Sequence, residues 1–160
     1  MATSKKIDVE ARILSANDEL AGQIRRQFAD AGVFVINLMA SPGGGKTSLI
    51  LRTIEALRAE LSIAAVDGDV VPVDVERIAA LGVPVELVNT GGNCHVDANM
   101  IQSVLPQLDL AGIDLLIIEN VGNLVCPAGF DLGADANVVI ASVPEGDDKP
   151  YKYPAMYRGA

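Results

Sequence analysis

Short apolar runs alternate with amphipathic stretches along most of the chain. The apolar runs are rich in β-branched residues, as buried strands are, and the stretches between them repeat apolar positions every three or four residues, as helices do. Strands are predicted at residues 33–40, 62–66, 84–88, 114–118 and 138–143, and helices at 8–31, 46–61, 74–81 and 96–108. This alternation predicts an α/β fold, with a mostly parallel sheet and helices on both faces.

The first predicted strand runs into a glycine-rich turn and then into a helix. The sequence there nearly matches G-x-x-x-x-G-K-[ST], the pattern of a phosphate-binding loop, although Ala40 stands at the first glycine position. Backbone N–H groups of the turn, the helix dipole and the Lys46 ammonium are expected to hold a triphosphate, and the Thr47 hydroxyl is expected to bind Mg²⁺. The expected nucleotide-binding residues of this segment are Pro42, Gly43, Gly44, Gly45, Lys46, Thr47 and Ser48. The alternative is an ordinary glycine-rich turn, which the strand-then-helix context disfavours.

Acidic residues follow two other predicted strands. Asp69 and Asp74 come after the second strand, where open α/β sheets bind ligands, and either carboxylate could reach Mg²⁺ directly or through water. Glu119 ends the apolar run 114–118 and is expected to bind Mg²⁺ or its water, with Gly122 offering a backbone N–H to the γ-phosphate. The alternatives are solvated loop acids, a helix N-cap at Asp74, and an ion pair at Glu119.

Cys94 and His95 are adjacent, although the chain has one histidine and two cysteines. Thiolate and imidazole are suitable ligands for Zn²⁺ and Ni²⁺. Cys126 lies in the loop after the fourth predicted strand, and loops after parallel strands should leave the same edge of the sheet. Up to three ligands per chain are therefore predicted, and a two-fold dimer could complete the site. The alternative reading, two small buried hydrophobes, stays open because the spacing is not that of a zinc finger.

Length, charge and composition exclude several classes of protein. The chain has 160 residues, enough for one domain, which we divide into an N-terminal helix (8–31), a binding core (33–143) and a tail (144–160) of no clear period. A net charge of −9 argues against nucleic-acid binding. No run approaches the roughly 18 apolar residues that cross a membrane. The low cysteine count and the lack of a signal-peptide pattern favour a cytoplasmic protein.

Four stretches of the sequence resemble one family, the hydrogenase nickel-incorporation GTPases (HypB). They are NLMASPGGGKTSLI, GNCHVDA, ENVGNLVCPA and EGDDKPYKYP, and the last three are specific to that family. The resemblance covers about residues 8–157. It implies a SIMIBI-like P-loop NTPase that binds GTP with Mg²⁺ and hydrolyses it slowly, with Lys46, Thr47 and Glu119 at the reacting phosphates and Asp69 and Asp74 at acidic positions around Mg²⁺.

The resemblance also implies a metal cargo and protein partners. Members of the family form nucleotide-dependent homodimers and hold Ni²⁺ or Zn²⁺ at the dimer interface through residues that match Cys94, His95 and Cys126. They pass nickel to the large subunit of nickel–iron hydrogenase with an accessory metallochaperone of the HypA type.

Two features of the family are missing from this stretch of sequence. It has no cysteine-rich or histidine-rich nickel-storage segment, so no storage is expected of it. It also ends at Ala160 without the N-K-x-D motif that pairs with guanine, so we expect a C-terminally truncated fold that does not encode base selectivity, has low stability and associates through an exposed sheet edge. Two alternative functions therefore stay open: a P-loop ATPase or kinase without metal cargo, and a non-catalytic nucleotide- or metal-binding module.

Overall fold

The computed structural model describes residues 8–68 and 73–160. Within these ranges, five strands form one sheet in the order β3-β2-β4-β1-β5, and all of its pairings are parallel. The strands are β1 (Phe34–Ala40), β2 (Ile63–Asp67), β3 (Val85–Leu87), β4 (Leu115–Glu119) and β5 (Ala136–Ile140). The helices are α1 (Val9–Ala31), α2 (Lys46–Leu57), α3 (Val73–Ala79), α4 (Ala98–Val104), α5 (Lys149–Lys152) and α6 (Pro154–Arg158).

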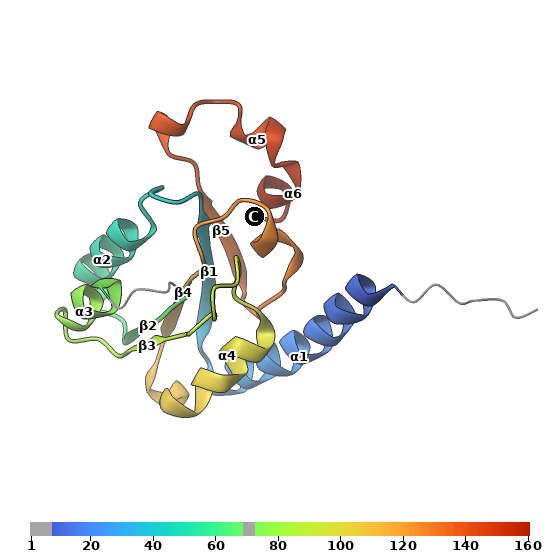
Figure 1. Cartoon of the computed structure of the whole chain (residues 1–160). Helices are drawn as coiled ribbons and strands as arrows, with labels where there is room; N and C mark the ends of the chain where they lie inside the picture. The colour runs from blue at the N-terminus through green and yellow to red at the C-terminus, as the bar shows by residue number, and fades with distance from the viewer. Residues whose placement is uncertain (1–7, 69–72) are drawn as a thin grey trace, which may run out of the picture.

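Helices cover both faces of the sheet, as Figure 1 shows, with α1 and α4 on one face and α2 and α3 on the other. The two faces have separate apolar cores because successive side chains of a strand point to opposite sides. Ile24 and Phe28 of α1 pack in one core with Leu116. Ile54 of α2 packs in the other with Ile117. The predicted parallel sheet with helices on both faces is confirmed.

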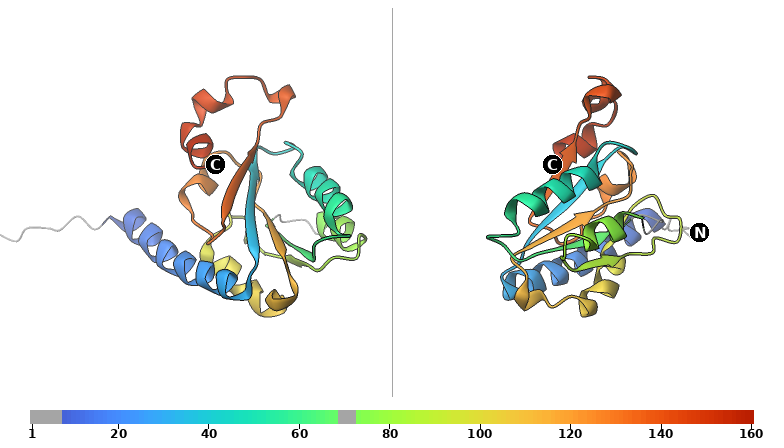
Figure 2. Two further views of the ribbon diagram at one scale, coloured as in Figure 1. Left: turned by 180° about the vertical axis from the view of Figure 1, so that it is seen from behind. Right: turned by 90° about the vertical axis from the view of Figure 1, so that its left-hand side faces the viewer.

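Helix α1 follows its sequence signals at both ends. The Asp8 side chain accepts a hydrogen bond from the first turn, and Gly32 ends the helix in the left-handed conformation with φ 74°. Only the second half of the helix contacts the sheet, however. Val9 and Ile13 are 62% and 55% exposed, and the first turns of α1 extend away from the sheet (Figure 2).

The last predicted strand is wrong at both of its ends. We predicted a strand at 138–143, whereas β5 begins at Ala136 and ends at Ile140. Ser142 and Glu145 form a capping box that turns the chain into a short 3₁₀ helix, so Val143 leaves the sheet and is 92% exposed.

The tail, for which the pattern predicted no element, forms α5 and α6 beyond the carboxyl ends of β1 and β5 (Figure 1). Met156 of α6 is buried in a third small apolar cluster with Met39 and Leu124. The tail therefore packs on the ends of the sheet beside the loop that follows β4. Among residues 8–68 and 73–160, none of the helices combines the length and the apolar composition that a membrane span needs.

Candidate functional site

The glycine-rich turn connects β1 directly to α2, as predicted. Gly43 and Gly45 take left-handed φ values of 73° and 97°, and Gly45 is the N-cap of α2. Beside the turn lies a cavity of about 270 Å³, lined by Gly43, Gly45, Lys46, Thr47, Ser48, Asp74, Arg77 and Glu119. Pro42 and Gly44 lie in the turn but not in the cavity lining. The Ser41 hydroxyl also donates a hydrogen bond to Glu145, which ties the start of the tail to this loop.

Glu119 points into this cavity from the end of β4. The Thr47 hydroxyl donates to its Oε1 at 2.8 Å, and the Lys46 ammonium lies 3.8 Å from the same oxygen. Glu119 is only 2% exposed, so burial raises the pKa of its carboxyl group to about 7, although the hydrogen bond from Thr47 and the charge of Lys46 partly offset the rise. Its Oε2 has no hydrogen-bond partner among the described residues. The ion pair that the sequence offered as the alternative role of Glu119 is therefore present, with Lys46 as its partner. The Oε2 atom of the same carboxylate is left without a hydrogen bond from the described residues.

These oxygen donors fit a hard divalent cation such as Mg²⁺. A hydroxyl and a carboxylate with one unpartnered oxygen face the same space, and Asp74 lines that space from the first turn of α3. Asp74 is held by Arg77 at 3.0 Å. Asp69, the other predicted Mg²⁺ residue, lies outside the described residues.

Gly122 lies against the phosphate-binding loop, and its predicted N–H contact with the γ-phosphate stays a prediction. A Cβ atom on Gly122 would lie 3.0 Å from Pro42 Cα and 3.2 Å from its nitrogen, which is closer than side chains normally approach backbone. Only glycine lets the segment after β4 pack this tightly on the loop. The structure thus brings the Gly122 backbone against Pro42 of the phosphate-binding loop.

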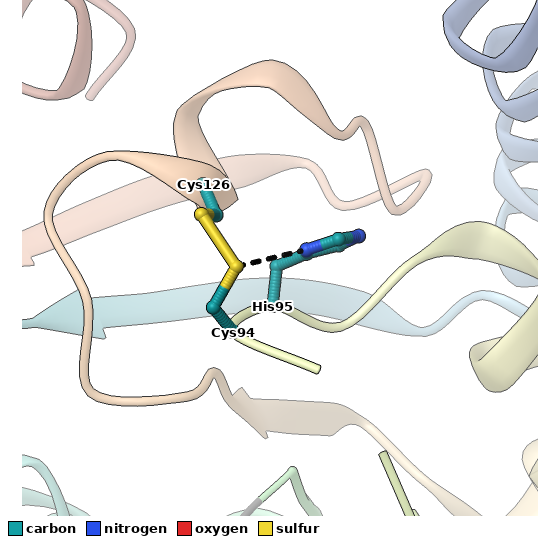
Figure 3. Close-up of side chains that lie close together, drawn as sticks. All are labelled: Cys94, His95 and Cys126. Atoms are coloured by element: carbon teal, nitrogen blue, oxygen red, sulfur yellow. Dashed lines mark hydrogen bonds between the residues drawn. A yellow bond between two sulfur atoms is a disulfide. The ribbon is translucent and has the colours of Figure 1, made fainter. Parts of the chain in front are cut away.

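Cys94, His95 and Cys126 come together from two loops, as Figure 3 shows. One ligand atom of each residue lies within 4.8 Å of the others, close to the span that bonds of about 2.0–2.3 Å allow across one metal ion. Their role as metal ligands stays a prediction. Burial lowers the pKa of the His95 imidazole, partly offset by Asp97, which favours the neutral form that binds metals.

The two sulfur atoms of Cys94 and Cys126 are bonded as a disulfide, which the sequence did not predict. The reason is proximity: the parallel topology brings two thiols that lie 32 positions apart to one edge of the sheet, with 6.1 Å between their Cα atoms. A disulfide offers no thiolate, so the predicted metal site would need this bond to be reduced by two electrons.

Four candidate functional residues were not predicted from the sequence. Asp67 is fully buried in register with Glu119, and its charge helps to raise the pKa of that acid. The apolar pattern predicts a strand that ends at residue 66, so it leaves Asp67 out of the strand and indicates acids further along the chain. Arg77 lies one helical turn from Asp74, a spacing that could have indicated it. Phe130 stacks on His95 with 3.8 Å between the ring centroids, and it lines an apolar cavity of about 540 Å³ beside the cluster.

The fourth missed residue is Asn120, whose buried side chain contacts the loop of His95. An asparagine directly after a strand-end acid carries no signal that names so distant a partner, so only the folded chain could identify it.

Comparisons with known proteins identify relatives of this chain in sequence and in fold. Residues 34–138 match the family described as CobW/HypB/UreG, nucleotide-binding domain. The hydrogenase maturation factor HypB of Azotobacter vinelandii is 48% identical over 161 aligned positions, which cover the whole of this chain and 53% of that protein. This chain therefore spans about half the length of that relative.

Two solved structures are similar as well. The crystal structure of the hydrogenase maturation factor HypB from Archaeoglobus fulgidus superposes with a TM-score of 0.85 at 45% identity, over 91% of this chain and 71% of that one. HypB from Helicobacter pylori, solved in complex with nickel, superposes with a TM-score of 0.85 at 41% identity, over 91% of this chain and 69% of that one.

Proposed function

Because this chain belongs to the HypB branch of the CobW/HypB/UreG family, we propose that it is the nucleotide- and metal-binding part of a GTP-dependent metallochaperone for hydrogenase maturation. In this proposal the chain works in the cytoplasm, binds GTP with Mg²⁺ and hydrolyses it. It holds Ni²⁺ or Zn²⁺ at a homodimer interface and delivers nickel to the large subunit of nickel–iron hydrogenase, together with a HypA-type partner.

One observation carries the proposal: a phosphate-type cavity and a thiol–imidazole cluster lie on loops at the same end of one parallel sheet. Glu119 lines the first site and Cys126 belongs to the second, and the two residues are seven positions apart in the sequence. A plain NTPase needs no soft-metal ligands beside its phosphate loop. The nickel complex of the related Helicobacter pylori protein supports the choice of metal.

The nucleotide chemistry follows from the residues that line the cavity. Backbone N–H groups of the glycine turn, the start of α2 and the Lys46 ammonium bind the β- and γ-phosphates and neutralise charge that develops during transfer. Thr47 and Glu119 offer oxygen ligands to Mg²⁺, which supplies further charge neutralisation when bound. The described lining of the cavity has no histidine, and Glu119 is engaged with Thr47 and Lys46. We therefore propose slow turnover.

The metal chemistry follows from the second cluster. Reduced Cys94 and Cys126 provide two thiolates and His95 provides a neutral nitrogen, which leaves a tetrahedral ion one ligand short. The partner copy or the recipient protein can supply that ligand, so the site can pass its metal on without being dismantled.

The decisive experiment measures nucleotide binding and metal binding separately, by calorimetry, on the reduced chain and on two variants. GTP and ATP are titrated with Mg²⁺, and Ni²⁺ and Zn²⁺ are titrated separately, into the parent, Lys46→Ala and Cys126→Ala. We expect Lys46→Ala to lose nucleotide and keep metal, and Cys126→Ala to lose metal and keep nucleotide. Unchanged metal binding by Cys126→Ala would favour a nucleotidase without metal cargo. Binding without any turnover of GTP would favour a non-catalytic module.

A further inference from the structure

Three loops from different strands meet between the nucleotide cavity and the thiol cluster. They are Gly68 after β2, Val96 before α4 and the segment 119–122 at the end of β4. The Gly68 N–H donates to the Glu119 carbonyl at 2.9 Å. A Cβ atom on Gly68 would lie 2.4 Å from Val96 Cγ2, so only glycine permits this contact. Consequently the Glu119 peptide and the loop that carries His95 pack against the same piece of backbone.

Asn120 occupies the interior of this junction and is 1% exposed. Its Oδ1 accepts hydrogen bonds from the N–H groups of Val96 at 3.1 Å and Val121 at 2.9 Å. Its Nδ2 donates to Asn37 Oδ1 on β1 at 3.0 Å, and its own N–H donates to the Leu38 carbonyl at 3.0 Å. Both ends of the side-chain amide are therefore held, one by the phosphate-loop strand and the other by the loop before α4.

We propose that Asn120 is a positioning residue that transmits the nucleotide state to the metal ligands, an inference that rests on the proposed function. Asn120 follows Glu119 directly, so a movement of that carboxylate between Thr47 and a phosphate-bound cation turns the peptide that carries Asn120. Its Oδ1 holds the N–H of the peptide that joins His95 to Val96. A displacement of Asn120 therefore shifts the backbone of a ligand residue through one buried hydrogen bond.

Asn123, which follows the segment 119–122, fixes the loop that carries Cys126, the other part of the cluster. Asn123 Oδ1 accepts from the N–H groups of Val125 at 2.7 Å and Cys126 at 3.2 Å. That contact is local and travels with its own loop. The Asn120 contact joins positions 24 apart, so it still connects the two ligand loops in the reduced chain, where the Cys94–Cys126 disulfide no longer joins them.

The test measures how nucleotide changes metal affinity. Ni²⁺ is titrated into the reduced chain with Mg²⁺ and either GDP or guanosine 5′-(β,γ-imido)triphosphate, and the ratio of the two dissociation constants measures the coupling. Asn120→Ala removes the hydrogen bond to the Val96 N–H. If the alanine variant does not fold, Asn120→Ser takes its place: serine keeps a polar group at this buried position, but its side chain is too short to reach the Val96 N–H. Asn137→Ala is the matched control: it removes the 3.0 Å hydrogen bond that Asn137 accepts from Asn37 and the 3.1 Å bond that it donates to the Gly159 carbonyl, and it keeps the bond between Asn120 and Val96.

We expect a parental ratio of roughly fivefold or more. Asn120→Ala should bring the ratio to within about twofold of one while both ligands still bind, and Asn137→Ala should keep the parental ratio. A merely structural role would weaken both affinities and leave their ratio unchanged. The proposal is overturned if Asn120→Ala keeps the parental ratio of Ni²⁺ dissociation constants, or if Asn137→Ala loses that ratio as fully as Asn120→Ala does. It is also overturned if the parent binds nucleotide and Ni²⁺ but its Ni²⁺ dissociation constant is the same with GDP and with the triphosphate analogue. A parent that binds neither nucleotide nor Ni²⁺ would instead overturn the proposed function.

Discussion

Replacing Glu119 by glutamine should make the protein more stable, and increasingly so as the pH rises. The folded chain holds the carboxyl proton more tightly than the unfolded chain, because the pKa rises from 4.5 to about 7 on burial. Stability from this group is complete below pH 4.5 and is lost as the pH rises through 7. A shift of this size corresponds to roughly 3 kcal/mol. Glutamine keeps the shape of the side chain and does not ionise, so Glu119→Gln does not lose stability as the pH rises.

The measurement is urea unfolding followed by circular dichroism, in EDTA and without nucleotide. Because the sequence pI is about 4.4, the series runs from pH 5.5 to pH 8 to avoid precipitation. Over that window the stability advantage of Glu119→Gln should grow by about 2 kcal/mol, because the unfolded-state carboxyl is already ionised at pH 5.5. Glu76→Gln, which removes an exposed acid on α3, controls for the change in net charge. An advantage that stays constant across the window would show that Glu119 is not destabilised by burial and would refute the reasoning.

Three further outcomes are expected. Reduction of the Cys94–Cys126 disulfide with a phosphine should be needed for Ni²⁺ binding, and equal calorimetric titrations of the oxidised and reduced chains would contradict the thiolate assignment. Gly122→Ala should weaken binding of a fluorescent GTP analogue by roughly tenfold, because the new Cβ would press on Pro42; unchanged anisotropy titrations would mean that the segment after β4 does not shape the cavity. Phe130→Leu should weaken Zn²⁺ binding in a chelator competition, because the stacked imidazole loses its support, whereas Phe130→Tyr should restore it; a leucine variant with parental affinity would count against positioning by the ring.

The sequence by itself determined the features that depend on neighbouring residues. Apolar periodicity located the five strands and the helices between them but not all of their ends: a capping box ended β5 at Ile140, and α2 and α4 end at Leu57 and Val104 rather than at residues 61 and 108. The glycine turn, Lys46 and Thr47 belong to one contiguous motif, so their joint placement at a helix start was predictable. Even the meeting of Cys94 with Cys126 could be predicted, because loops after parallel strands share an edge of the sheet.

Only the tertiary structure decided which distant groups touch. Strand order places β4 between β2 and β1, and this order sets Asp67 beside Glu119 and lets Asn120 reach across to β1. Periodicity carries no information about strand order, because any order buries the same alternating faces. The packing of Met156 on the sheet and the stacking of Phe130 on His95 have the same origin: each joins segments that local pattern describes separately and that only the closed core brings into contact.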